Sequence, residues 1–205
     1  MKKNILIIGS SGYLGKKLKK ILNKKFNLIT PNKKKLNIAK IDKIKKYFKN
    51  DIDFVINLSG QISNDKRLMK NIIVNGNKNI IKLCKNKKTK VFYLSTSLIY
   101  GFSNRKVIEN SIKNPVDSYA KFKYLSERAY LKSKINFVIL RLCNIYNGKK
   151  TGVVKNILNS IQKNKKMHLT NKNVYRNYIH INDATKIILK MLEKNLKHNI
   201  YNLGF

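Results

Sequence analysis

A chain of 205 residues with 42% hydrophobic residues is long enough for one domain, or one domain with a small appendage, and for a core that needs no disulfide or metal. No apolar run approaches the roughly 18 residues that span a bilayer, and we predict no membrane association. The formal net charge of +37 predicts non-specific attraction to polyanions, but the lysines are spread over nearly every segment, which argues against a specific nucleic-acid site.

Short apolar runs alternate with segments of helical periodicity up to Leu142. The apolar runs predict strands buried on both faces, at 4–9, 26–30, 53–60, 90–97 and 136–142. The predicted helices are 13–22, 41–49, 66–85 and 116–133. Repeated strand–helix–strand units with right-handed crossovers predict the α/β fold class, with a doubly wound parallel sheet covered by helices on both faces.

After Leu142 the alternation loosens. Residues 153–163 and 183–194 are expected to be helical, whereas 173–181 and 199–204 are expected to be short extended segments. In the long helix 66–85, apolar residues at helical spacing predict the buried face. These expected core positions are Leu68, Ile72, Ile73, Ile80, Ile81 and Cys84.

The two cysteines, Cys84 and Cys143, both fall in apolar segments. This favours buried thiols in a reducing compartment, and we predict no metal site. The uninterrupted apolar run near the start, Ile5 to Ile8, is shorter than the roughly 7–15 residues of a secretory signal. We therefore expect a cytoplasmic location.

A glycine-rich loop follows the first predicted strand and opens the first predicted helix. Gly9, Gly12 and Gly15 recur there at intervals of three residues, with Tyr13 and Leu14 between them. Glycine permits a tight turn, lets the backbone approach a pyrophosphate, and packs helix on strand, while the helix N-terminus offers N–H groups to an anion. The loop therefore predicts a dinucleotide site; the alternative, that the glycines only shape a turn, stays open.

Seven segments, in this order, resemble those of the extended short-chain dehydrogenase/reductases, the nucleotide-sugar epimerase and dehydratase family. They are 9–15, 55–61, 93–101, 118–123, 140–147, 176–183 and 201–204. The resemblance implies a Rossmann fold, with residues 1–145 as the dinucleotide-binding domain and 146–205 as a truncated substrate-binding portion. It also implies that the chain is short between residues 147 and 175 and lacks the C-terminal part of a usual member.

The segment 118–123 carries Tyr119 four residues before Lys123, a spacing that places two side chains on one face of a helix. Three other tyrosines have a lysine at the same spacing, so spacing alone says little in this lysine-rich chain. The resemblance singles out this pair and adds Thr96. It implies that Thr96 holds the reacting oxygen, that Tyr119 exchanges a proton, and that Lys123 lowers the tyrosine pKa and bonds the nicotinamide ribose. For Thr96 a strand-end hydroxyl satisfied locally remains the alternative.

The resemblance further implies a nicotinamide dinucleotide, NADP or NAD. Its expected contacts are Gly9, Gly12, Tyr13, Leu14, Gly15, Lys33, Leu58, Ser59, Gly60, Tyr119 and Lys123. An acidic residue at the end of the second strand would bind the ribose diol of NAD, but Thr30 or Pro31 takes that position and lysines follow it. This absence of a carboxylate favours NADP.

On the substrate side, Asn144 and Arg176 are expected by resemblance to face the diphosphate of a nucleotide sugar. Arg141 either joins them or forms a structural ion pair. His180, between two isoleucines, is expected to be structural. The family usually carries an asparagine at the position of Ile73, which leaves one active-site contact open.

Dehydratases of this family carry an Asp-Glu pair directly after the catalytic threonine, where this chain has Ser97 and Leu98. The leading hypothesis is therefore an NAD(P)-dependent nucleotide-sugar epimerase or 4-keto reductase, expected to dimerise through the helices 66–85 and 116–133. The alternatives are a dinucleotide-binding module without catalysis and a nucleic-acid-binding protein driven by charge.

Overall fold

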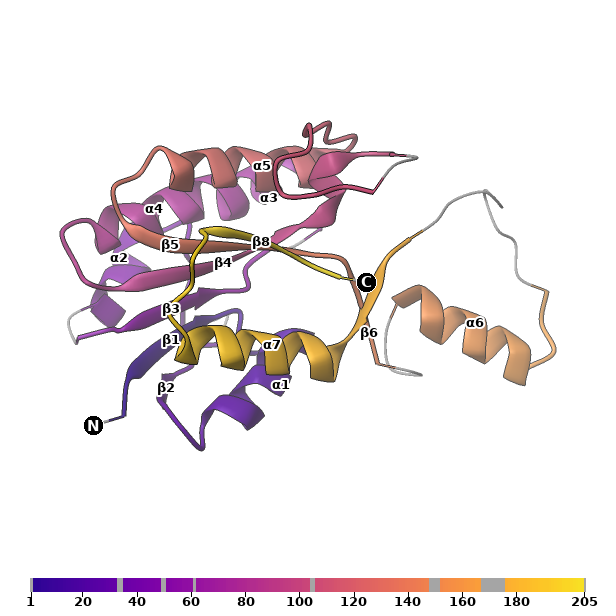
Figure 1. Cartoon of the computed structure of the whole chain (residues 1–205), viewed down its shortest axis with the longest axis horizontal. Helices are drawn as coiled ribbons and strands as arrows, with labels where there is room; N and C mark the ends of the chain where they lie inside the picture. Colours follow the sequence, from indigo (N-terminus) through magenta and orange to yellow (C-terminus); the bar gives the residue numbers. More distant parts are fainter. Residues whose placement is uncertain are drawn as a thin grey trace.

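The computed structural model describes residues 2–32, 35–48, 51–60, 62–103, 106–147, 152–166 and 176–204. Six parallel strands form one sheet in the order β2-β1-β3-β4-β5-β8 (Figure 1). Their bounds are β1 (Asn4–Ile8), β2 (Asn27–Ile29), β3 (Phe54–Asn57), β4 (Lys90–Thr96), β5 (Asn136–Leu142) and β8 (Ile200–Leu203). The predicted doubly wound sheet is confirmed.

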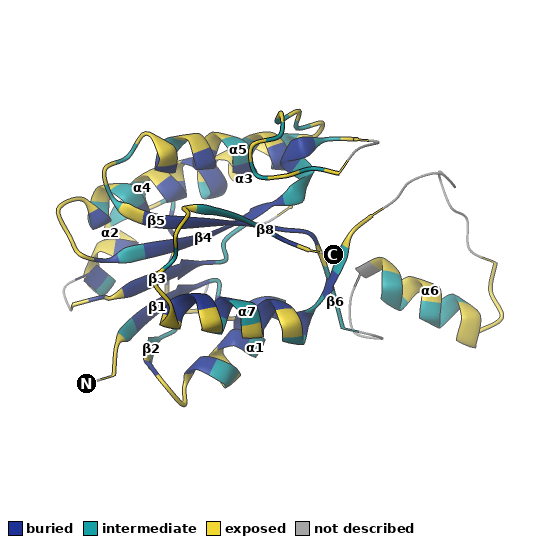
Figure 2. Ribbon diagram, in the orientation of Figure 1, coloured by how far each residue is buried: buried dark blue, intermediate teal, exposed yellow. Residues whose placement is uncertain are grey.

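Helices cover both faces of this sheet, and each face has its own apolar core (Figures 1 and 2). One face is covered by α1 (Tyr13–Leu22) and α7 (Ile181–Glu193). The other is covered by α2 (Ile41–Lys45), which continues into η1 (Lys46–Phe48), by α4 (Gly76–Cys84) and by α5 (Ser118–Leu131). The strands read as continuous apolar runs because both of their faces are buried.

The predicted long helix 66–85 contains a break in its hydrogen-bond pattern. It consists of α3 (Lys66–Lys70), a π-helical turn η2 (Asn71–Asn75) and α4. The prediction that Leu68 is a core residue is wrong: Leu68 is 43% exposed, and its neighbour Met69 is buried instead. The wide turn shifts the helical phase, so the buried face before it cannot be extrapolated from the spacing after it.

The chain beyond β5 forms a second, two-stranded parallel sheet of β6 (Asn144–Tyr146) and β7 (Tyr178–His180). The helix α6 (Gly152–Gln162) lies beside it, and a 3-10 turn η3 (Ser97–Tyr100) follows β4. The division at residue 145 stays a prediction, although β8 returns to pair with β5 in the main sheet. None of the helices in the described part of the chain is long and apolar enough to cross a membrane.

The strand order changes direction at β1, because β2 lies on one side of it and β3 on the other. In open α/β sheets, ligands bind outside the carboxyl ends of the strands at such a point. The glycine loop follows β1 and the segment Leu58–Gly60 follows β3. Both predicted dinucleotide segments therefore lie at this point of the sheet.

Candidate active site

The glycine loop joins the carboxyl end of β1 to the amino end of α1. Gly9 has φ +82°, in the left-handed region that glycine adopts readily, and a Cβ added to it would lie 3.2 Å from the Cβ of Leu58. The amide of Gly12 donates to the carbonyl oxygen of Gly9 at 3.0 Å, and no side chain caps the start of α1. The first turn of α1 therefore keeps N–H groups for an anion.

Two hydroxyl groups among the predicted dinucleotide residues lack a hydrogen-bond partner. Ser59 Oγ and Tyr13 Oη are shielded from solvent and unpaired within the described residues. Polar atoms that are shielded from solvent and unpaired destabilise the fold until a ligand or a water molecule forms a hydrogen bond with them. Together with the uncapped helix, these hydroxyls fit the phosphate and hydroxyl groups of a dinucleotide.

Tyr119 and Lys123 converge beside the segment that follows β3. Lys123 is 2% exposed, and its Nζ donates to the carbonyl oxygens of Ser59 at 2.9 Å and Leu94 at 2.6 Å. A Cβ added to Gly60 would lie 2.8 Å from Lys123 Nζ and 3.5 Å from Tyr119 Oη. The fold therefore brings the predicted tyrosine and lysine together at the predicted dinucleotide segment.

Burial sets the protonation of this pair. It raises the pKa of the Tyr119 hydroxyl to about 12, and the nearby Asp117 carboxylate adds to the rise. It lowers the pKa of the Lys123 ammonium to about 7, although the Glu127 carboxylate opposes the fall. The Tyr119 pKa is therefore shifted up by burial, and the lowering by Lys123 stays a prediction.

Lys123 should make stability depend on pH. Its pKa is about 7 in the folded chain against an ordinary 10.5, so between these values the unfolded chain binds a proton that the folded chain does not. Stability therefore rises with pH in this window, by at most about 1.4 kcal/mol for each pH unit. Chemical denaturation at several pH values in this window should show a smaller rise in the free energy of unfolding with pH for Lys123→Met than for the wild type. Lys121→Met, an exposed neighbour on α5, should behave as wild type; an unchanged rise in Lys123→Met would contradict the prediction.

Thr96 is the last residue of β4 and is 7% exposed. Its Oγ1 accepts a hydrogen bond from the amide of Leu98 at 3.2 Å and so caps η3. This contact matches the alternative of a locally satisfied hydroxyl. A hydroxyl that accepts one bond can still donate another, however, so the catalytic role of Thr96 stays a prediction.

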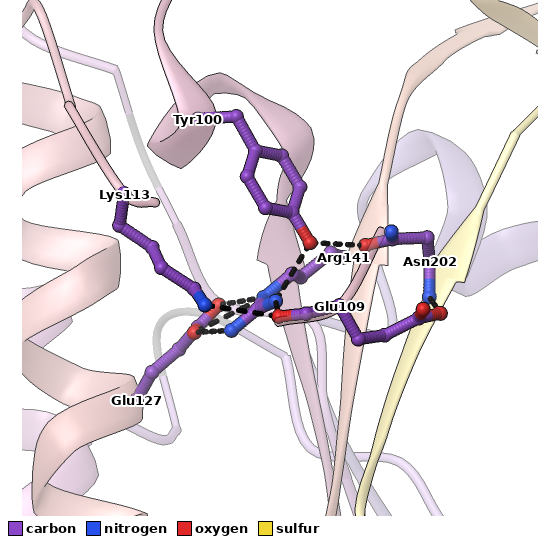
Figure 3. A network of polar contacts seen from close by, with 6 residues as sticks. All are labelled: Tyr100, Glu109, Lys113, Glu127, Arg141 and Asn202. Carbon is purple, nitrogen blue, oxygen red and sulfur yellow. Dashed lines mark hydrogen bonds and ion pairs between the residues drawn. The ribbon is translucent and has the colours of Figure 1, made fainter. Parts of the chain in front are cut away.

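Arg141 forms the structural ion pair that the sequence left open (Figure 3). Its Nη2 lies 2.8 Å from Glu127 Oε2, and both side chains are fully shielded from solvent. Its Nη1 donates to the hydroxyl of Tyr100 and to the carbonyl oxygen of Glu109, each at 2.7 Å. Tyr100 in turn donates to Asn202 Oδ1 at 2.7 Å. We call these five residues the arginine network; they join α5, β5, β8, η3 and the loop before α5.

The predicted substrate residues lie on the smaller sheet. Asn144 is exposed, and both its backbone N and its Nδ2 donate to the carbonyl oxygen of Asn177 at 3.2 Å. Arg176 is also exposed and directly precedes Asn177, so the fold brings the two predicted residues close together. His180 caps the amino end of α7, which is a structural role. Lys33 lies outside the described residues.

The family model for the NAD dependent epimerase/dehydratase family matches residues 5–204. The chain belongs to this family. At 29% identity over 98% of the chain, it is similar to dTDP-D-glucose 4,6-dehydratase of Dictyostelium discoideum, and it spans 58% of that protein. It is also 29% identical, over 62% of the chain, to ADP-L-glycero-D-manno-heptose-6-epimerase of Brachyspira hyodysenteriae, and that match covers 45% of the epimerase.

Solved structures share the fold of this epimerase/dehydratase family member. The Bordetella bronchiseptica enzyme WbmG, solved with NAD, matches with a TM-score of 0.88 and 17% identity, over 100% of this chain and 73% of that chain. The dTDP-4-dehydrorhamnose reductase of Bacillus anthracis, solved with NADP, matches with a TM-score of 0.88 and 20% identity, over 100% of this chain and 75% of that chain. The chain is thus shorter than each of these proteins.

The sequence patterns do not indicate five polar residues of this family member that have 0% exposure within the described residues: Asn57, Asn77, Ser126, Glu127 and Thr185. A signal existed for Glu127, which stands four residues after Lys123 on one helix face in a chain with nine acidic residues. Asparagines are so frequent in this sequence that Asn57 and Asn77 gave no comparable signal.

A cavity of about 820 Å³ lies at the amino ends of the strands, on the side of the sheet opposite to the glycine loop. It includes the first residues of β3, β4 and β5. Its lining mixes lysines with carboxylates, among them Lys87 and Asp53. The cavity therefore offers no consistent charge to a ligand. The site residues that the resemblance predicts lie at the carboxyl ends of the strands instead. We place the candidate site at the carboxyl ends of β1, β3 and β4.

Proposed function

We propose that this family member is an NAD(P)-dependent nucleotide-sugar epimerase or 4-keto reductase in which Thr96, Tyr119 and Lys123 form the catalytic set. The observation that supports it most is the convergence of the Tyr119 hydroxyl and the Lys123 ammonium on Gly60, beside the glycine loop. The named relatives, which include a dehydratase and an epimerase of nucleotide sugars, support the same substrate class.

The proposed roles follow from the protonation of the pair. A nicotinamide dinucleotide at the glycine loop would supply or accept the hydride. Tyr119, protonated at neutral pH because its pKa is about 12, would donate its proton to a keto oxygen that Thr96 holds. Lys123, when charged, would stabilise the phenolate that remains. An epimerase needs Tyr119 to accept a proton first, so the high pKa favours the reductase.

Elimination of water has less support in this chain. Ser97 and Leu98 follow Thr96 at the positions where the family's dehydratases carry an acid pair, and both lie in η3. Neither side chain is a carboxylate that could take or give a proton. We therefore prefer the epimerase and the reductase, although several relatives are dehydratases.

We propose that the dinucleotide is held by the glycine loop residues Gly9, Gly12, Tyr13, Leu14 and Gly15, by Leu58, Ser59 and Gly60, and by Tyr119 and Lys123. The preference for NADP rests on the end of β2, where neither Thr30 nor Pro31 offers a carboxylate that would repel a 2′-phosphate. Solved relatives include complexes with NAD and with NADP, so both dinucleotides have to be compared.

The test of this proposal is a calorimetric titration with NADPH and with NADH at about 0.3 M salt, which screens the bulk positive charge. Saturable one-to-one binding of either supports the site, and tighter NADPH binding supports the preference. Turnover of 4-keto nucleotide sugars that consumes NADPH mole for mole indicates a reductase, whereas interconversion of two nucleotide sugars that differ at one hydroxyl-bearing carbon, without net consumption of dinucleotide, indicates an epimerase. Binding without turnover favours the non-catalytic module, and no binding contradicts the proposal.

We also propose a homodimer through α3 and α5. These helices expose Leu68, Leu125 and Leu131 at 43%, 42% and 50%. Sedimentation velocity should show a dimer that Leu125→Glu weakens, because a buried, unpaired carboxylate opposes association. A monomeric wild type would contradict this part.

Gly60→Ala should impair catalysis more than stability. The new Cβ would lie 2.8 Å from Lys123 Nζ, and the flexible end of the lysine can yield. Displacement of the lysine is expected to lower turnover by about 10²-fold. In Gly15→Ala the new Cβ would instead lie 2.8 Å from the Cα of Ser10, which cannot yield, so stability should fall by about 1–3 kcal/mol. Turnover and denaturant midpoints of the two variants check this; equal turnover of Gly60→Ala and wild type would contradict it.

A further inference from the structure

Two asparagine side chains bridge the end of β3 and the helix α4 in the interior of the protein. Asn57 and Asn77 both have 0% exposure. Asn57 Nδ2 donates to Asn77 Oδ1 at 2.8 Å, and Tyr130 on α5 donates its hydroxyl to the same oxygen at 2.7 Å. Buried amides of this kind are costly unless their polar atoms are paired, and here each amide both donates and accepts a hydrogen bond.

Backbone groups fix the direction of both amides. Asn77 Nδ2 donates to the carbonyl oxygen of Ile73 at 2.6 Å, in the π-helical turn, and a carbonyl can only accept. Asn77 Oδ1 must then face Asn57 and accept from its Nδ2. Asn57 Oδ1 is thereby turned to the backbone amide of Ser59, from which it accepts at 3.0 Å. We call this chain from Ile73 through Asn77 and Asn57 to Ser59 the amide relay.

The amide relay ends at the residue that binds the lysine. The carbonyl oxygen of Ser59 accepts from Lys123 Nζ at 2.9 Å, and within the described residues the other acceptor of this ammonium is the Leu94 carbonyl. Ser59 lies outside helix and strand. Asn57 Oδ1 holds its N–H, and the Ser59 carbonyl follows on the other side of the same Cα. By anchoring the N–H of Ser59, Asn57 restricts where its carbonyl can lie, and so where Lys123 finds its second acceptor.

We propose that Asn57 and Asn77 are positioning residues that hold the Ser59 carbonyl where it binds Lys123. The consequence for catalysis rests on the function proposed above, but the positioning itself does not. Without the amide relay, Ser59 is free to turn, Lys123 loses one of two acceptors, and its side chain becomes more accessible.

Trace acetylation of the protein without added ligand, measured lysine by lysine by mass spectrometry, tests this directly. The neutral amine of an accessible lysine reacts, so Lys123 should react slowly in the wild type relative to the exposed Lys121 on the same helix. Asn57→Ala should raise this ratio about tenfold, the effect of about one lost hydrogen bond. Asn77→Leu removes the acceptor of the Asn57 Nδ2 at the other end of the amide relay. It should also raise the ratio of Lys123 to Lys121 acetylation, because the Asn57 amide is then free to turn.

The matched control is Thr89→Val. It removes a buried hydrogen bond of 2.7 Å, from Thr89 to the carbonyl oxygen of Ile52, at the far end of the same strands. It should lower stability as a relay variant does and leave the Lys123 ratio unchanged. An equal rise in Thr89→Val would show general loosening and overturn the proposal, as would an unchanged ratio in a folded relay variant.

The wild type alone gives a further decisive measurement. The Ser59 amide, bonded to Asn57, should exchange its hydrogen slowly by NMR; exchange at the rate of an unstructured chain would overturn the proposal even if no variant folded. Neither acetylation nor exchange requires a dinucleotide. A failure of the proposed function would appear in the NADPH titration, and a failure of the amide relay would appear here.

Discussion

Tyr119→Phe is expected to lower turnover of the nucleotide sugar by about 10²–10⁴-fold, because it removes the proposed proton donor to the reacting oxygen. Binding of the dinucleotide should change far less. The glycine loop, the Ser59 carbonyl and Lys123 all keep their geometry when one hydroxyl is lost. Single-turnover kinetics with NADPH, together with the calorimetric titration, separates these two effects.

Tyr124→Phe is the matched control for this change. Tyr124 lies on the same helix, is partly buried, and has no place in the proposed machinery. It should retain wild-type turnover. If Tyr119→Phe turned over at a rate close to that of Tyr124→Phe, the proton donor would be another group and the catalytic set would have to be reassigned.

Glu127→Ala is expected to lower the free energy of unfolding by about 3–5 kcal/mol. The reason is that the guanidinium of Arg141, 1% exposed, would keep its charge in the interior without the carboxylate that lies 2.8 Å away. Its bonds to Tyr100 and to the Glu109 carbonyl replace only part of that interaction. Urea denaturation followed by circular dichroism measures the change.

The double variant Glu127→Leu with Arg141→Met distinguishes a stabilising pair from an unpaired charge. Removing both charges together should restore part of the lost stability, since a buried ion pair is often replaced by apolar residues at little cost. Recovery stays incomplete, because Tyr100 and the Glu109 carbonyl then lose their donor. A Glu127→Ala variant as stable as the wild type would refute the interpretation.

The strands were predictable because burial on two faces leaves an uninterrupted apolar run, as in Phe54–Asn57 and Lys90–Thr96. The two helix layers follow from their apolar spacing. The π-helical turn at Asn71–Asn75 was not predictable, since no local residue preference demands it. It is accompanied by side chains that arrive from elsewhere: Ser126 of α5 donates to the Ile73 carbonyl at 3.0 Å.

Resemblance located the pair Tyr119 and Lys123, which the structure brings together. Their protonation was beyond the sequence, because a pKa depends on how much solvent the whole fold removes. The ion-pair partner of Arg141 and the amide relay could not be predicted from the sequence for a related reason. Asn57 and Asn77 come into contact only when β3 and α4 pack together, and no pattern in either segment indicates this contact.

The pairing of β5 with β8 has a consequence for how the molecule assembles. Ile139 lies beside Ile200, and their separation along the chain exceeds that of Ile5 and Phe54, which pair β1 with β3. The closure of this outer edge therefore costs slightly more loop entropy. Until β8 docks, β5 presents an unpaired edge to other chains, and Asn202 is missing from the arginine network. Docking of β8 replaces the seven-residue edge of β5 with the four-residue edge of β8, so conditions that delay this docking are expected to promote aggregation through β5.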